Sequence, residues 1–170
     1  AKAIEILSHV LVSNPQYPGV HHKIALIQSH LADLTSELGG YTKALFHFQI
    51  ASQMGRENDA LLMDWALTLI SYADAIDFRG DGEGLLKEAE YKMIQAAKLG
   101  NSDAYYHLAC LYSITHELDK AMHFIRRAQK FDALPSWDEM AEDSWLENLR
   151  ASDDFNTFLM SLSLGSSSQD

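Results

Sequence analysis

Residues 105–128 read YYHLACLYSITHELDKAMHFIRRA, and this stretch decides the fold class. Its second half carries Ala121, Ile125 and Ala128, whose offsets of 0, 4 and 7 place them on one face of a helix with 3.6 residues per turn. Small residues at 0 and 7 let a partner helix approach, and the bulky residue at 4 fills the gap between the two helices. The partner helix is predicted upstream, from an apolar face formed by Tyr105, Leu108, Ala109, Tyr112 and Leu118.

The same spacing occurs four times, each time with a helix-ending position twelve residues after its first member. The four sets are Ala3, Leu7, Val10, Pro15; Ala44, Phe48, Ala51, Arg56; Ala89, Met93, Ala96, Asn101; and Ala121, Ile125, Ala128, Ala133. One set is typical of an ordinary amphipathic helix. Four sets in 170 residues indicate an array of stacked helical units.

The stretch from residue 105 to residue 135 resembles the tetratricopeptide repeat (TPR), an antiparallel pair of helices with a period of 34 residues. The residues that carry the resemblance are Tyr105, Leu108, Ala109 and Tyr112 in the first helix, Ala121, Ile125 and Ala128 in the second, and Pro135, one step late, as the closing proline. A less complete copy ends at Ala51. It has Gln28 and Thr35 where aromatic residues are usual, and Arg56 replaces its closing proline.

The distances between the sets exceed the period of the family. Ala3 and Ala44 are 41 positions apart, and Ala44 and Ala89 are 45 positions apart. The excess of seven and eleven residues over 34 is close to two and three helical turns, so it lengthens a helix without rotating its buried face. We therefore expect two unusually long first helices, at about 19–38 and 59–78. The second keeps one apolar stripe, formed by Leu62, Trp65, Ala66, Leu69, Ala73 and Ile76.

The predicted fold class is all-α, with residues 1–163 as a single TPR-like domain: a right-handed superhelix of antiparallel helix pairs. Its parts are a half repeat at 1–17, repeats at 18–58, 59–101 and 102–135, a helical cap at 136–163, and a disordered tail at 164–170. The chain starts with the second helix of a pair. We therefore expect a fragment of a longer array, and the alternative is a lone N-terminal helix that docks on the next pair.

Residues after Pro135 have the pattern of a cap. Ser136 and Glu139 match a capping box, in which each side chain bonds a backbone N–H of the other's residue. The stretch from residue 141 to residue 159 also resembles the end-of-group segment that closes some bacterial TPR arrays. Two short helices are expected to shield the open end of the last repeat. Their apolar side would consist of Trp137, Met140, Trp145, Leu149, Phe155, Phe158 and Leu159.

Composition limits the partners and the compartment. The chain is 47% hydrophobic, enough for a continuous core, and no apolar run is long enough to span a bilayer. The formal net charge of −11 argues against nucleic acid binding, which needs a basic surface. The single cysteine, Cys110, excludes an internal disulfide and fits the reducing cytoplasm.

Residues that could carry chemistry do not form a recognisable catalytic or metal motif. His21 and His22 are adjacent, so they point in different directions on a helix, and His116-Glu117 lacks the second histidine of a zinc-hydrolase pair. Cys110 falls inside a repeat helix, where a packed thiol is the ordinary state. We expect no enzyme activity, no resident metal and no cofactor.

One stretch partly matches a calcium loop. Asp77, Asp81, Gly82 and Glu88 occupy four positions of that pattern. Arg79 stands where a second carboxylate should be and would place a cation against the ion. We interpret the stretch as an Asp/Gly turn between two helices.

In TPR proteins the first helices line a concave groove that holds partner peptides, and the resemblance implies the same here. The groove-facing candidates are Ser29, Asp33, Met63, Leu67, Ile70, Tyr106, Cys110 and Ile114. Met63, Leu67 and Ile70 lie on a helix whose other face is also apolar, so they either pack in the core or bind a partner. These positions do not resemble the carboxylate clamp of chaperone-binding TPR domains.

The leading function is a protein-interaction scaffold or adaptor that binds a peptide or helix of another protein, apolar or basic, in this groove. The alternative is a small acidic TPR chaperone of bacterial type III secretion that holds an unstable client. Size, acidity and an apolar groove fit the alternative. The truncated first repeat and the cap do not.

Overall fold

The computed structural model describes residues 6, 9–10, 12–13, 17–77 and 80–166, and every element in these ranges is helical. This confirms the all-α class. The predicted half repeat at 1–17 and the end of the predicted tail, 167–170, lie mostly outside the described residues. The chain divides into two compact units, residues 1–100 and residues 101–170.

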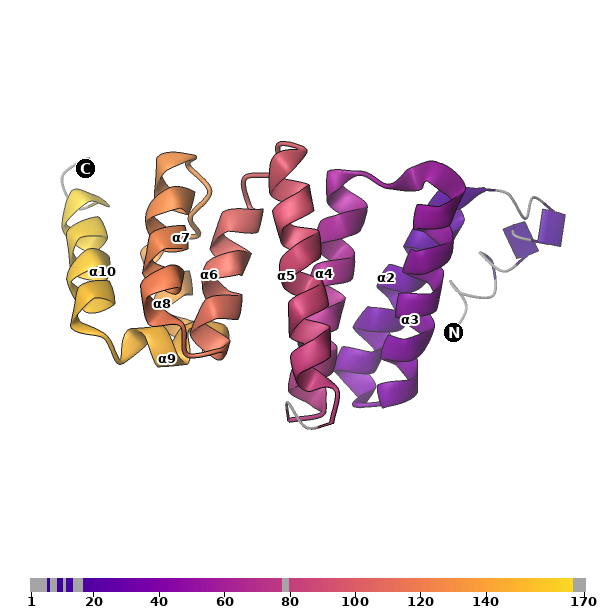
Figure 1. The fold of residues 1–170 in the computed structure, drawn as a ribbon, viewed down its shortest axis with the longest axis horizontal. Helices are drawn as coiled ribbons and strands as arrows, with labels where there is room; N and C mark the ends of the chain where they lie inside the picture. The colour runs from indigo at the N-terminus through magenta and orange to yellow at the C-terminus, as the bar shows by residue number, and fades with distance from the viewer. Residues whose placement is uncertain (1–5, 7–8, 11, 14–16, 78–79, 167–170) are drawn as a thin grey trace. The chain divides into compact units, whose positions relative to one another are not determined.

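The first unit contains two antiparallel helix pairs (Figure 1). Helix α2 (Pro18–Thr35) packs on α3 (Leu38–Ala51), and α4 (Asp59–Ala75) packs on α5 (Gly82–Lys98). A π-helical turn, η1 (Ser52–Arg56), extends α3 and leads into Asn58, whose side chain caps α4 by accepting a bond from the N–H of Leu61 at 2.8 Å. Helix α4 also packs on α3, so the two pairs share one core.

Both long first helices are present but end three residues before their predicted ends. Ser36 terminates α2 with a left-handed backbone at φ 57°, and its N–H donates to the carbonyl oxygen of Ala32 at 2.8 Å. Asp77 has φ 53° just after α4. A residue in the left-handed conformation ends a helix. The spacing of apolar residues does not reveal such a residue, because serine and aspartate adopt this conformation only occasionally.

The repeated spacing marks the cores of both units. All nine residues at offsets 0, 4 and 7 of the last three sets are 0% exposed: Ala44, Phe48, Ala51, Ala89, Met93, Ala96, Ala121, Ile125 and Ala128. In the first set only Val10 is described, and it is 39% exposed. The apolar stripe of α4 is likewise buried from Leu62 to Ala73. Helical periodicity therefore located these core positions correctly.

Helices α2 and α3 approach each other closely at Gly40. A Cβ atom at Gly40 would lie 2.8 Å from the Cβ of Ala32 and 3.1 Å from the carbonyl oxygen of Gln28. A Cβ at the neighbouring Gly39 would meet nothing within 4 Å. The two adjacent glycines of α3 therefore differ only in the space around them.

Gly40→Ala is expected to lower the free energy of unfolding by about 1–2 kcal/mol, since overpacking of about 1–3 kcal/mol exceeds the gain in helix propensity. Gly39→Ala, the matched control, is expected to raise it by about 0.5 kcal/mol because only the propensity changes. Urea unfolding of both variants checks this. Effects of the same sign and size would show that the close approach of α2 and α3 does not constrain position 40.

The second unit consists of α6 (Ala104–Ile114), α7 (Leu118–Lys130) and the C-terminal elements that cover them. These elements are α8 (Trp137–Glu142), the 3-10 turn η2 (Ser144–Leu146), α9 (Glu147–Arg150) and α10 (Asp153–Ser166). The predicted capping box is present at the start of α8, where the N–H of Ser136 donates to Glu139 Oε2 at 3.0 Å.

The cap contributes four fully buried side chains to the second unit: Met140, Leu146, Leu149 and Phe155. Trp137, expected on the covering side, is 46% exposed instead. The cap also has more helix than expected. Residues 164–166, predicted to be part of a disordered tail, form the end of α10.

Candidate functional site

Polar contacts join α2 to α4 along the face where the two first helices meet. The Oγ1 of Thr68 on α4 lies 3.0 Å from the Oγ of Ser29 on α2, and both residues are buried. One end of the same face is held by His22 Nε2, which lies 2.7 Å from Asp64 Oδ2. Hydrogen bonds between side chains, rather than apolar packing alone, thus set the contact between α2 and α4.

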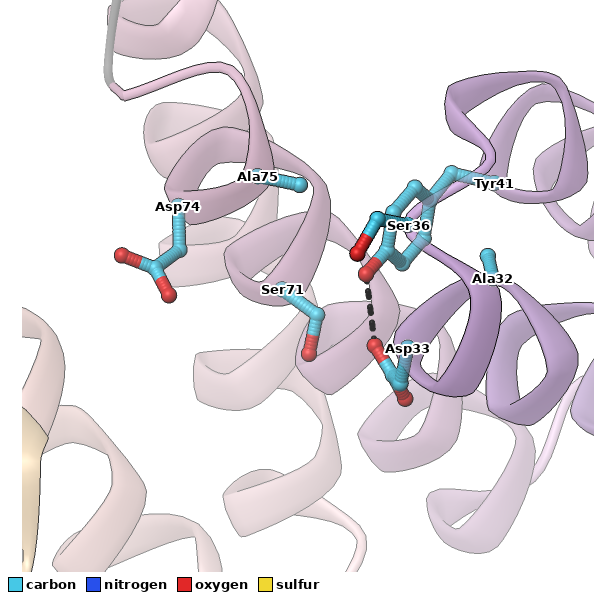
Figure 2. A pocket seen from close by; sticks show the side chains of 7 residues that line it. All are labelled: Ala32, Asp33, Ser36, Tyr41, Ser71, Asp74 and Ala75. Atoms are coloured by element: carbon cyan, nitrogen blue, oxygen red, sulfur yellow. Dashed lines mark hydrogen bonds between the residues drawn. The ribbon is translucent and has the colours of Figure 1, made fainter.

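Two hollows follow this contact. The first has a volume of about 200 Å³ and is lined by Leu26, Ser29, His30, Asp33, Asp64, Leu67, Thr68 and Ser71. The second, about 280 Å³, is lined by Ala32, Asp33, Ser36, Tyr41, Ser71, Asp74 and Ala75 (Figure 2). Asp33 and Ser71 line both hollows, so the two hollows adjoin along α2 and α4. These residues together are named the α2–α4 trough.

The trough is acidic. Asp33, Asp64 and Asp74 contribute carboxylates, and the lining contains no lysine or arginine. Asp33 accepts a hydrogen bond of 2.6 Å from the hydroxyl of Tyr41, as Figure 2 shows. Burial, followed by this bond to Asp33, raises the pKa of Tyr41, so the phenol stays protonated and remains a donor. The ring of Tyr41 is in turn stacked on Tyr72 of α4, with ring centroids 5.3 Å apart.

Carboxylates and hydroxyl groups along a depression form favourable contacts with hydrogen-bond donors and cations. An arginine or lysine side chain of a bound peptide would make charge-assisted bonds to Asp33 or Asp74, and these bonds are stronger than neutral ones. Backbone N–H groups of an extended segment would find acceptors in Ser36 and Ser71. The arrangement is therefore suited to binding a basic polypeptide segment.

The structure brings together three of the five groove candidates in the first unit. Ser29, Asp33 and Leu67 all line the trough. Met63 and Ile70 are 6% and 0% exposed and do not line it. They are core residues in this structure, because α4 is apolar around most of its circumference. The sequence left open whether these residues pack in the core or face the groove. Met63 and Ile70 pack in the core, whereas Leu67 lines the trough.

Several lining residues were not among the sequence candidates. Asp64, Ser71 and Asp74 lie on α4 at spacings of seven and three, on the same side as Leu67 and Thr68. A polar stripe along an otherwise apolar helix was the available signal, because such a stripe marks the face that meets water. Tyr41 was not predictable in this way, since it reaches the trough from α3.

The remaining three candidates belong to the second unit, where the cap occupies their face of α6. The hydroxyl of Tyr106 donates to Asp143 Oδ2 at 2.6 Å, and Cys110 Sγ lies 3.7 Å from the same oxygen. Burial raises the pKa of Cys110, so it is a packed thiol rather than a thiolate. Ile114 is half-buried. A binding role for these three residues stays a prediction. For Tyr106 and Cys110, the cap segment would have to move away before a partner could reach them.

The cap segment is bonded to the backbone and side chain of Ser113. Ser113 Oγ accepts from the N–H of Leu149 at 3.1 Å, and its carbonyl oxygen accepts from Asn148 Nδ2 at 3.0 Å. Ser113 and Leu149 are both 0% exposed. These contacts make the segment an integral part of the second unit.

A larger hollow of about 450 Å³ lies beside α3 and is lined by Thr42, Leu45, Phe46, Gln49, Trp65 and Glu88. Its charges are paired within the protein. Lys92 Nζ lies 3.3 Å from the centroid of the Trp65 ring and 3.4 Å from Glu88 Oε1. Glu88 is thereby engaged by a lysine of the chain. In the trough Asp64 is bonded to His22 and Asp33 to Tyr41, but no lysine or arginine lines it, so the trough is the better candidate for a basic ligand.

The calcium-like stretch is divided between a turn and a helix. Asp77 has a left-handed backbone, Asp81 precedes α5, and Glu88 pairs with Lys92. Across the described ranges, no group of three or more histidine, cysteine, aspartate or glutamate side chains is arranged to hold a metal ion. In those same ranges, no helix combines the length and apolar character that crossing a membrane requires.

Comparison of the chain with protein-family models, with curated proteins and with solved structures found no match. The resemblance to the TPR family therefore depends on the sequence pattern alone.

Proposed function

We propose that this chain is a protein-interaction module, of TPR type in its helix pairs, and that its α2–α4 trough binds a basic segment of a partner protein in the cytoplasm. The observation that carries the proposal is the pair of adjoining hollows between two first helices, lined by three carboxylates and by no lysine or arginine. Burial of the nine residues at the repeated spacing supports the TPR-like pairing of α2 with α3, α4 with α5, and α6 with α7.

The length of α2, which forms one wall of the trough, sets an upper limit on the size of the ligand. Helix α2 has 18 residues and so extends about 27 Å at about 1.5 Å per residue. An extended peptide rises about 3.3 Å per residue, so about eight residues would cover the helix. The test ligand is therefore an octapeptide with alternating arginine and alanine, compared with a peptide in which glutamate replaces arginine.

The arginine peptide is expected to bind the intact chain in isothermal titration calorimetry, and the glutamate peptide is not. Asp33→Asn and Asp74→Asn should each weaken binding about tenfold, because a hydrogen bond to a charged group contributes about 1.5–3 kcal/mol. Both variants should keep the melting temperature of the parent. Asp33→Asn preserves an acceptor for Tyr41, and Asp74 is exposed.

Glu57→Gln is the matched control, since it removes one exposed carboxylate of the first unit outside the trough. It should change the affinity less than twofold. If all three variants weaken binding equally, the peptide responds to net charge and not to the trough. If the arginine peptide does not bind the parent protein at all, the proposed function is wrong.

A further inference from the structure

Two adjacent histidines attach α2 to two different helices. His21 Nδ1 lies 2.9 Å from His47 Nδ1 on α3, with ring centroids 5.1 Å apart. His22 Nε2 lies 2.7 Å from Asp64 Oδ2 on α4. Successive side chains on an α-helix point about 100° apart, which is why neighbours in the sequence reach two different partners. Both contacts involve imidazole rings, which can gain a proton in acid.

The contact between His21 and His47 requires a specific distribution of protons. A neutral imidazole has one donor nitrogen and one acceptor nitrogen, so a bond between two Nδ1 atoms needs one ring with Nδ1–H and one ring with a bare Nδ1. The donor ring can take a further proton at its Nε2 and keep the bond. When the acceptor ring is also protonated, two N–H groups and two positive charges face each other. The pair therefore tolerates one added proton and is broken by the second.

The surroundings do not offset that charge. Burial lowers the pKa of His21, and burial followed by the charge of His21 lowers the pKa of His47. Among the residues that the structure describes, no carboxylate contributes to either shift. His21 is 8% exposed, which limits the water that could solvate an imidazolium ion.

Among the described elements, α3, η1 and α4 pack against α2. These elements carry other charged groups besides the two histidines. They include Lys23 on α2 and Lys43 on α3, both exposed, and Asp59 and Asp64 on α4. Asp64 is bonded to His22, and Asp59 is half-exposed at the start of α4. The sequence of η1 also contains Arg56.

The contact between His22 and Asp64 responds in the opposite way. A neutral imidazole with its proton on Nε2 donates to the carboxylate, and an imidazolium ion donates through the same atom. Protonation of His22 turns the hydrogen bond into an ion pair and leaves its geometry unchanged. Acid therefore keeps this second attachment of α2.

We infer that α2 has a pH-sensitive anchor, in which acidification releases its contact with α3 at His47 while its contact with α4 at Asp64 persists. This inference does not depend on peptide binding by the trough. The adjacent histidines would then have a conformational role. In acid the α2–α3 pair would loosen at one end, while α2 remained bonded to α4.

The direction of the pH dependence follows from the lowered pKa values. Above the ordinary histidine pKa of about 6.5 both rings are neutral in the folded and the unfolded chain. In that range the pair therefore does not make the free energy of unfolding change with pH. As the pH falls below about 6.5, the unfolded chain binds protons before the folded chain does. The free energy of unfolding therefore decreases with falling pH, until the pH has passed the lowered pKa values of the folded state.

The first test compares the melting temperature at pH 7.5 and pH 5.0 for the intact chain and for His47→Gln, which removes the titrating ring. The parent is expected to lose on the order of 4 °C more than His47→Gln between the two pH values. His30→Gln, an exposed histidine on the same helix, is the matched control and should behave as the parent does. Equal losses for the parent and for His47→Gln would overturn the inference.

A second measurement needs no variant and so does not depend on the folding of His47→Gln. Imidazole ¹⁵N chemical shifts of the labelled parent protein, followed from pH 8 to pH 4.5, report the proton positions of each ring. His21 and His47 are expected to titrate in two coupled steps, while His22 keeps its Nε2–H throughout. Titration of His21 and His47 as two independent groups would contradict the shared bond.

Discussion

Replacing Phe48 with alanine is expected to lower the free energy of unfolding of the first unit by about 3–5 kcal/mol, the usual cost of truncating a buried phenylalanine. Phe48 is 0% exposed on α3, and its ring is stacked on Trp65 of α4 with centroids 6.0 Å apart. It also lies beside the ring of His22, with the two ring centroids 5.9 Å apart. The substitution therefore leaves a cavity between three helices that rigid neighbours cannot fill. Urea unfolding of the intact chain, followed by circular dichroism, measures the loss.

Phe46 provides a matched control on the same helix. It has the same side chain two positions earlier but is 59% exposed. Phe46→Ala is expected to change the free energy of unfolding by less than about 0.5 kcal/mol, as is usual for surface substitutions. Equal losses for Phe46→Ala and Phe48→Ala would show that α3 is rotated relative to the structure described above.

The cap is expected to contribute to the core of the second unit to a similar degree. Met140→Ala should lower its free energy of unfolding by about 2–5 kcal/mol, because Met140 is 0% exposed and its truncation leaves a cavity. Met160→Ala is the matched control from α10, where the side chain is 66% exposed, and it should cost less than about 1 kcal/mol. Thermal melts of both variants distinguish the outcomes. A loss at position 140 as small as that at position 160 would mean that the cap covers α6 and α7 without stabilising them.

Periodicity predicted the core because burial on a helix repeats with the turn. The sets that begin at Ala44, Ala89 and Ala121 needed no knowledge of the neighbouring helices. The capping box at Ser136 was predictable for a similar reason, since its two partners are three residues apart. The ends of α2 and α4 were not predictable. They depend on left-handed conformations at Ser36 and Asp77, residue types that are more often found in other regions of backbone space.

The candidate site was predictable only where one helix determines it. Ser29, Asp33 and Leu67 lie on the first helices and were identified from their positions there. Tyr41 enters the trough from another helix. The bond from Tyr106 to Asp143 joins residues that are 37 positions apart. A contact of that kind depends on how the cap folds back, and the spacing of residues within one helix contains no information about it.

The indole of Trp65, which lies beneath the ammonium group of Lys92, gives the first unit an optical signal of its own. Trp65 is the only tryptophan in residues 1–100, and the other two, Trp137 and Trp145, belong to the cap of the second unit. Indole emission moves to longer wavelength as the ring meets water. Trp65 is 9% exposed and sits against a cation, whereas Trp137 is 46% exposed. Subtracting the emission of a Trp65→Phe variant from that of the parent would therefore isolate the fluorescence of the first unit. The intact chain thus contains a built-in spectroscopic reporter that can show whether its two units lose structure together or one after the other.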